Sequence, residues 1–138
     1  MKALLDTCIL SELRLAHNMT ILKSTLDLFN ASDLYISVVS IGEIFKGIGL
    51  LPASRKKMEL QQWAHQLETN YRDRILPIDS DIAHTWGDLT AHAQTQGKII
   101  PIADGLIAAT ALVHGLQVMT RNTADFEYTG VLLINPWA

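Results

Sequence analysis

The stretch Ala3-Leu4-Leu5-Asp6, at the start of the chain, decides the fold prediction. Three consecutive apolar residues bounded by a polar one are typical of a short, fully buried strand, the kind that parallel sheets contain. Binding sites in open parallel sheets collect at the carboxyl ends of the strands. We therefore expect Asp6 to lie at a strand end where such a site can form.

Further along the chain, apolar β-prone segments alternate with helical patterns. The predicted strands are 34–38, 75–78, 117–120 and 131–134, and Pro77 places the second of these at a sheet edge because proline cannot donate to a central ladder. Strands separated by helices predict an α/β sandwich with a mostly parallel sheet. The 138 residues suffice for one hydrophobic core and show no linker, so we expect a single domain spanning 1–138.

The helices are predicted from apolar spacing and from their end signals. Met19, Leu22, Leu26 and Phe29 recur at helical spacing, and Ser40-Ile41-Gly42-Glu43 has the form of a capping box that would begin a helix at Ser40. Pro52 is expected in the first turn of the next helix, which carries Met58, Leu60, Trp63, Ala64 and Leu67. Two further helices are predicted, from Ile82 to about Gln96 before Gly97 and from Ala103 to His114 before Gly115.

The composition restricts the function classes. A formal net charge of −3 provides no global field for a nucleic acid, so any nucleic-acid binding must depend on local basic groups. The single cysteine, Cys8, excludes an internal disulfide and a multi-cysteine zinc site, which fits a reducing cytoplasm. No apolar run is long enough for a signal peptide or a membrane span, so we expect a cytoplasmic protein without a membrane partner.

Four acidic residues, Asp6, Glu43, Asp104 and Asp125, are the candidate site. Singly, each has a structural explanation: Asp6 as a helix cap, Glu43 in the capping box, Asp104 in a first helical turn and Asp125 in a turn. Together they are less easily explained, because the first three are embedded in apolar sequence and burying unpaired carboxylates is costly. Since few basic residues lie nearby in the sequence, a divalent cation that prefers oxygen ligands, Mg²⁺ or Mn²⁺, is the expected neutraliser.

An acidic site of this kind favours phosphodiester hydrolysis. Carboxylate-held Mg²⁺ can neutralise charge on the phosphate and acidify a water molecule at neutral pH. The five histidines have spacings that build no ligand set, and we expect them at the surface or in packing roles; they are His17, His65, His84, His92 and His114.

Five blocks of the sequence, in order along the whole chain, closely resemble the PIN-domain ribonucleases, and among them the VapC-type toxins of bacterial toxin–antitoxin pairs. The blocks are LLDTCILSEL at 4–13, SVVSIGE at 37–43, PIADGLIAA at 101–109, TRNTADF at 120–126 and LINPW at 133–137. One block would be weak support, whereas five with the family's order and spacing are a specific signal.

The resemblance implies a three-layer α/β/α fold and a Mg²⁺-dependent endoribonuclease that Mn²⁺ can also support. It implies Asp6, Glu43 and Asp104 as core acids, Asp125 as the fourth with Asn122 as its alternative, and Thr7 as a supporting polar neighbour. It also implies a homodimer, a small antitoxin as partner and a larger toxin–antitoxin assembly. The alternative is a PIN-fold binding module that acts through its partner without cutting RNA.

Other features have structural interpretations. The triplet Arg55-Lys56-Lys57 is expected on a solvated helix face, and the three tryptophans, Trp63, Trp86 and Trp137, in the core or a dimer interface. Cys8 is expected as a small buried residue.

Overall fold

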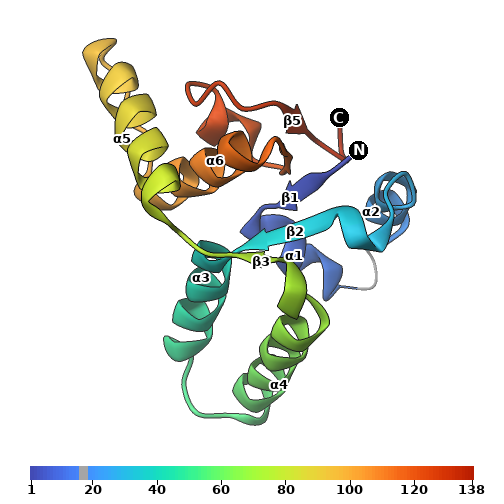
Figure 1. Cartoon of the computed structure of the whole chain (residues 1–138). Coiled ribbons are helices and arrows are strands. Elements are labelled where there is room, and N and C mark those ends of the chain that lie inside the picture. The colour runs from blue at the N-terminus through green and yellow to red at the C-terminus, as the bar shows by residue number, and fades with distance from the viewer. Residues whose placement is uncertain (16–18) are drawn as a thin grey trace.

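A computed structural model describes residues 1–15 and 19–138, and within these residues five strands and six α-helices form (Figure 1). The strands are β1 (Ala3–Leu5), β2 (Leu34–Ser37), β3 (Ile75–Leu76), β4 (Gln117–Met119) and β5 (Leu133–Ile134). The α-helices are α1 (Thr7–Leu13), α2 (Met19–Leu26), α3 (Val38–Gly49), α4 (Arg55–Asn70), α5 (Ser80–Thr95) and α6 (Ile102–His114). Short 3₁₀ turns are η2 (Ala31–Asp33), η3 (Arg72–Arg74) and η4 (Thr123–Phe126).

The sheet has the order β3-β2-β1-β4-β5, and every neighbouring pair is parallel. The first strand is central: Leu4 is in register with Tyr35 of β2 on one side and with Val118 of β4 on the other. Strand β3 lies at the edge, as the sequence predicted, but it ends at Leu76, so Pro77 follows the strand instead of lying within it. Because all strands point the same way, their carboxyl ends share one edge of the sheet.

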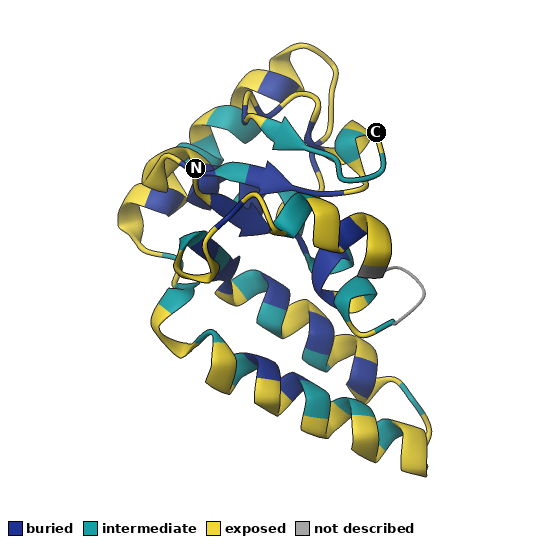
Figure 2. Cartoon of the chain, turned by 90° about the vertical axis from the view of Figure 1, so that its right-hand side faces the viewer, coloured by how far each residue is buried: buried dark blue, intermediate teal, exposed yellow. Residues whose placement is uncertain are grey.

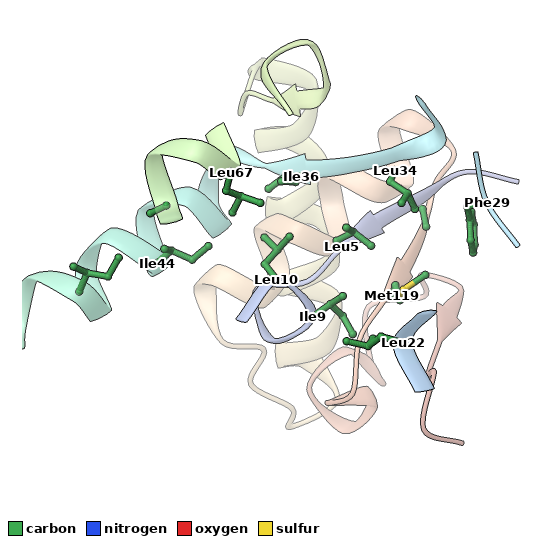
Figure 3. Packing of buried hydrophobic residues seen from close by; sticks show 13 residues of the cluster. Leu5, Ile9, Leu10, Leu22, Phe29, Leu34, Ile36, Ile44, Leu67 and Met119 are labelled. Carbon is green, nitrogen blue, oxygen red and sulfur yellow. The ribbon is translucent and has the colours of Figure 1, made fainter. Parts of the chain in front are cut away.

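Alternate residues of β1 face two different cores. Ala3 and Leu5 pack in a cluster with α1, α2, α3 and α4, several residues of which are drawn in Figure 3. Leu4 points the opposite way, into a second cluster with Ile107 of α6 and Phe126 of η4. All three β1 residues have no exposed surface, and Figure 2 shows buried strands at the centre of the sheet and helices with exposed outer faces. The three-layer α/β/α prediction is confirmed.

Helix α5 packs mainly against α6, and its far end projects away from the rest of the molecule in Figure 1. Gly97 and Gly115 follow α5 and α6 with φ angles of 74° and 67°, which L-residues with side chains rarely adopt, so both helices end where the sequence indicated.

The capping-box prediction is wrong. Helix α3 begins at Val38, and Ser37 caps it by accepting a hydrogen bond from the Val39 amide. Ser40 therefore lies inside the first turn and is fully buried, so it is not the cap and does not account for Glu43. The β-branched Val38 was predicted to end the preceding strand, but it begins α3, and the next residue, Val39, packs against the second core cluster.

One further helix start and one helix end differ from the predictions. Ser54, not Pro52, precedes α4, and its hydroxyl accepts from the Lys57 amide three residues later. The pattern that predicted one helix through Phe29 corresponds to α2, which ends at Leu26, while α1 is a separate helix capped by Asp6. No helix in the described part of the chain combines the length and the apolarity that a bilayer crossing requires.

Candidate active site

The four predicted acids lie on elements that meet at the carboxyl edge of the sheet. Asp6 follows β1 directly, and Glu43 lies in the second turn of α3, the helix that follows β2. Asp104 is in the first turn of α6, and Asp125 is in η4 after β4. Segments about a hundred residues apart in the sequence are therefore brought together by the parallel topology.

Asp6 is the most buried of these acids, with 5% of its surface exposed. Its Oδ1 accepts from the Thr7 amide at 2.8 Å, and its Oδ2 accepts from the fully buried Thr120 hydroxyl, also at 2.8 Å. The Cys8 thiol donates to the same Oδ2 at 3.5 Å. Burial raises the pKa of the Cys8 thiol, so it remains protonated and able to donate. These donors fix the orientation of the carboxylate.

Thr7 connects this junction to α3. Its hydroxyl lies 2.6 Å from Glu43 Oε1 and 2.9 Å from Ser40 Oγ. A carboxylate can only accept, so the single Thr7 proton goes to Glu43 and forms the stronger, charge-assisted bond. Although Glu43 is exposed, its carboxylate is thereby held towards the β1–α1 junction.

Asp104 has no such donors. No hydrogen bond to its carboxylate is found among the described residues, and its pKa is raised from 3.8 to about 6. Burial is the largest cause, and the negative charges of Asp6, Asp125 and Glu43 follow in that order. All four carboxylates therefore lie close enough to interact, and their repulsion is concentrated at Asp104.

The loop after β4 carries the two candidates for the fourth position. The negative charge of Asp125 raises the pKa of Asp104. Asn122 acts through its backbone: its N–H donates to the Thr120 hydroxyl at 3.0 Å, and its C=O accepts from the Asp125 N–H at 3.1 Å. Thr120 thus joins this loop to Asp6.

The donor set consists of oxygen atoms, which suits a hard divalent cation. Within residues 1–15 and 19–138, no three acidic, histidine or cysteine side chains are gathered tightly enough to hold one ion as they stand. Glu43 and Asp125 are exposed, whereas Asp6 is buried and Asp104 is partly buried.

Three residues of this network were not predicted as site residues: Ser40, Thr120 and the thiol of Cys8 in its contact with Asp6. Thr120 could have been found, because it follows β4 at the same sheet edge as Asp6. Ser40 could not, because its predicted capping role assigned the hydroxyl elsewhere.

The basic triplet, the histidines and the tryptophans were predicted to have surface or packing roles. Arg55 and Lys56 are exposed, and Lys57 donates to the Leu51 carbonyl at 3.0 Å near the start of α4. The histidines at 65, 84, 92 and 114 are exposed, while His17 lies outside the described residues. The three tryptophans are partly buried, and Trp63 and Trp137 pack against the first core cluster.

A groove of about 240 Å³ adjoins the acidic residues. Its near end is formed by Thr7 and Glu43, and Arg14 lies at the end of α1. Ser11 of α1 also lines it. The other lining residues are mostly apolar and come from α3, α4 and the segment between them; they are Ile44, Gly47, Ile48, Leu51, Leu60 and Trp63.

The parallel α/β/α fold with acids at its carboxyl edge is the arrangement of PIN domains, and the PIN-domain family model matches residues 3–132. The chain belongs to the PIN-domain family. Its resemblance to the VapC-type members is confirmed by the relatives: it is 37% identical to VapC ribonuclease Y4jK of Sinorhizobium fredii over 134 residues, covering 96% of each chain. It is 38% identical to toxin FitB of Neisseria gonorrhoeae over 136 residues, covering 97% of each.

Solved structures give the same result. A chain in the crystal structure of FitAcB from Neisseria gonorrhoeae matches with a TM-score of 0.89 at 36% identity, covering 98% of both chains. A chain in VapBC-1 from nontypeable Haemophilus influenzae matches at 20% identity with a TM-score of 0.81, covering 100% of both, which supports the fold alone.

Proposed function

We propose that the chain is a Mg²⁺-dependent endoribonuclease and the toxin of a toxin–antitoxin pair, acting in the cytoplasm. The observation that carries the proposal is the gathering of four acids at one edge of the sheet, where the partly buried Asp104 is offered no hydrogen-bond donor by the described residues. The three other charges add to burial in raising the pKa of Asp104. A fold gains nothing from such an arrangement unless a cation balances it. The ribonuclease names of the relatives support RNA as the substrate.

The roles of the residues follow from their contacts. Asp6, Glu43, Asp104 and Asp125 would hold the cation, and when bound it would neutralise charge on the phosphodiester and acidify a water molecule. Thr7 and Thr120 orient Glu43 and Asp6. Asp125 is assigned as the fourth ligand instead of Asn122, because its charge acts on Asp104 while Asn122 acts through its backbone.

Purified chain freed of any partner should hydrolyse RNA with Mg²⁺ or Mn²⁺ and stop when EDTA is added. The readout is the appearance of internal cleavage products from a defined RNA. If folded protein supplied with metal leaves a broad set of RNAs intact, the ribonuclease assignment is wrong. The alternative, a PIN-fold binding module that acts through its partner, would then remain.

The antitoxin is proposed to occupy the groove beside Glu43. Complexes of the structural relatives, such as the toxin–antitoxin complex from Klebsiella pneumoniae, support a partner of this kind. The apolar floor around Ile44 and Trp63 fits a segment with apolar side chains, and the acidic end fits an Arg or Lys that reaches towards Asp6 and Asp104.

Expression of the wild type alone should arrest growth, and co-expression with the neighbouring reading frame should relieve the arrest. The Asp104→Asn variant is the control and should be harmless alone. High-level, harmless expression of folded wild type would contradict the toxin assignment.

A homodimer, within a larger complex with the antitoxin, is the proposed assembly. Ile99 and Ile102, beside the start of α6, are 91% and 68% exposed, and an apolar pair of this kind is costly to leave in water. Light scattering should give twice the chain mass of 15.3 kDa, and a mass of one chain at micromolar concentration would contradict the dimer.

A further inference from the structure

Arg121 is a basic residue anchored beside the acidic cluster. It directly follows Thr120, which donates to Asp6, and its own backbone amide donates to the Cys8 sulfur at 3.5 Å. Cys8 in turn donates to Asp6. The backbone of Arg121 is therefore separated from the central carboxylate by two hydrogen bonds, while no role for its side chain was predicted.

The side chain lies over the ring of Trp137. Its guanidinium is 4.6 Å from the centroid of the Trp137 ring, and Trp137 packs against the first core cluster. Its Nη1 donates to Glu12 Oε1 at 3.3 Å, yet half of the side chain remains exposed. A guanidinium has five N–H donors in a planar fork, so this geometry presents further donors to solvent.

The location suits a nucleic-acid phosphate. Glu12 lies six residues after Asp6 along α1, which corresponds to about 9 Å along the helix axis. With a net charge of −3 and four carboxylates at the site, RNA binding requires a local cation to offset their repulsion. Arginine on an aromatic ring is well suited to this, because it can bind phosphate with two donors while its face stays stacked.

We propose that Arg121, supported by Trp137, binds an RNA phosphate next to the one that is cleaved, and that Glu12 accepts its guanidinium when RNA is absent. The inference rests on the proposed ribonuclease function and names a substrate-binding residue for it. The competing explanation is a tether between the C-terminal segment and α1. Exposed ion pairs contribute little to stability, so a tether predicts a slightly lower melting temperature and unchanged RNA binding.

The test compares Arg121→Gln with Arg72→Gln, a matched control. Arg72 is exposed on η3, which precedes β3 and therefore lies at the opposite edge of the sheet from the acids. Binding of a short fluorescein-labelled single-stranded RNA is followed by anisotropy in EDTA, where no cleavage occurs, and kcat and KM are measured in Mg²⁺.

For Arg121→Gln we expect Kd and KM to rise roughly tenfold, with a smaller fall in kcat. The slope of log K against log salt should lose about 0.7, the value for one phosphate contact to a single strand. Arg121→Lys keeps the charge, so its Kd and KM should lie between those of the wild type and Arg121→Gln. Wild-type values of Kd, KM and salt slope in Arg121→Gln would overturn the inference, whereas a wild type that neither binds nor cuts RNA would overturn the proposed function itself.

Glu12→Gln tests the second half of the proposal. It should tighten RNA binding in the wild-type background and have less effect in the Arg121→Gln background, because the competing acceptor matters only when the guanidinium is present. Equal tightening in both backgrounds would show a general charge effect and would overturn the exchange between Glu12 and phosphate.

Discussion

The β1–α1 junction and the first turn of α6 each hold one acid of the site, and they treat it in opposite ways. Asp6 is 5% exposed and accepts from the Thr7 amide, the Thr120 hydroxyl and the Cys8 thiol. Asp104 is only partly buried, but it has no donor among the described residues, and burial and like charges raise its pKa to about 6. The junction satisfies its carboxylate internally, whereas the α6 turn does not.

The difference lies in what each carboxylate contributes to the isolated chain: the hydrogen bonds of Asp6 stabilise the junction, whereas the charge of Asp104 destabilises the α6 turn. The donors around Asp6 fix the orientation of the central carboxylate, as hydrogen bonds to metal-ligating side chains do. The repulsion at Asp104 is a cost to the isolated chain, and a bound cation would convert it into affinity. The same residue type can therefore be predicted to respond to substitution with opposite signs in the two regions.

The largest expected effect is on catalysis and is the same for both regions. Asp6→Asn and Asp104→Asn should each lower kcat for RNA hydrolysis by at least about a thousandfold, since a ligated cation contributes several kcal/mol to transition-state stabilisation. Asp88→Asn, an exposed acid on α5, is the control and should keep the wild-type rate. Folded Asp104→Asn with wild-type turnover would remove Asp104 from the site.

The second effect is on stability and distinguishes the regions. Asp6→Ala should lower the free energy of unfolding by about 2 kcal/mol, because it deletes the α1 cap and leaves the buried Thr120 hydroxyl without its acceptor. Urea denaturation in EDTA measures it. An Asp6→Ala variant as stable as the wild type would mean that these hydrogen bonds do not hold the junction.

The third effect is smaller and opposite in sign. The pKa of Asp104 is raised on folding, so the native state binds more protons than the unfolded state between pH 3.8 and about 6. The free energy of unfolding therefore falls as pH rises through this window, and the loss is complete above it. Asp104→Asn should remove the loss and gain about 1–2 kcal/mol at pH 7.5 without metal, a gain that disappears below pH 4.

Urea melts of Asp104→Asn and wild type in EDTA across this pH range test the sign. The Asp88→Asn control should follow the wild-type pH dependence. A variant that is less stable than the wild type at pH 7.5 would show that the Asp104 charge stabilises α6, as an ordinary first-turn carboxylate does.

The sequence predicted most of this fold because its decisive signals are local. The run Ala3-Leu4-Leu5 is apolar on both faces and forms the buried central strand, and Gly97 and Gly115 mark two helix ends by their backbone conformation. The start of α3 was misplaced because Ser37 and Ser40 both precede helical residues, and only packing decides which of them caps.

The sequence could propose the four candidate acids but not the residues that hydrogen-bond to them. Asp6 and Asp104 stand out as charges within apolar sequence, and the family resemblance implied that they are core acids of one site. Thr120 contacts Asp6 across 114 positions, and Arg121 reaches Glu12 across 109, so neither contact has a local signal. Both contacts arise because β1 and β4 are parallel neighbours, which places the residues that follow β4 beside those that follow β1.

The central claim is that a divalent cation balances the repulsion at Asp104, and thermal denaturation with added Mn²⁺ tests it most directly. At a hundredfold excess over the dissociation constant, Mn²⁺ should stabilise the wild type by about 2.7 kcal/mol, or roughly 5–10 °C in midpoint. Asp104→Asn should lose most of that gain, while Asp88→Asn should retain it. A wild-type midpoint that is unmoved by Mn²⁺ across the millimolar range would contradict the account.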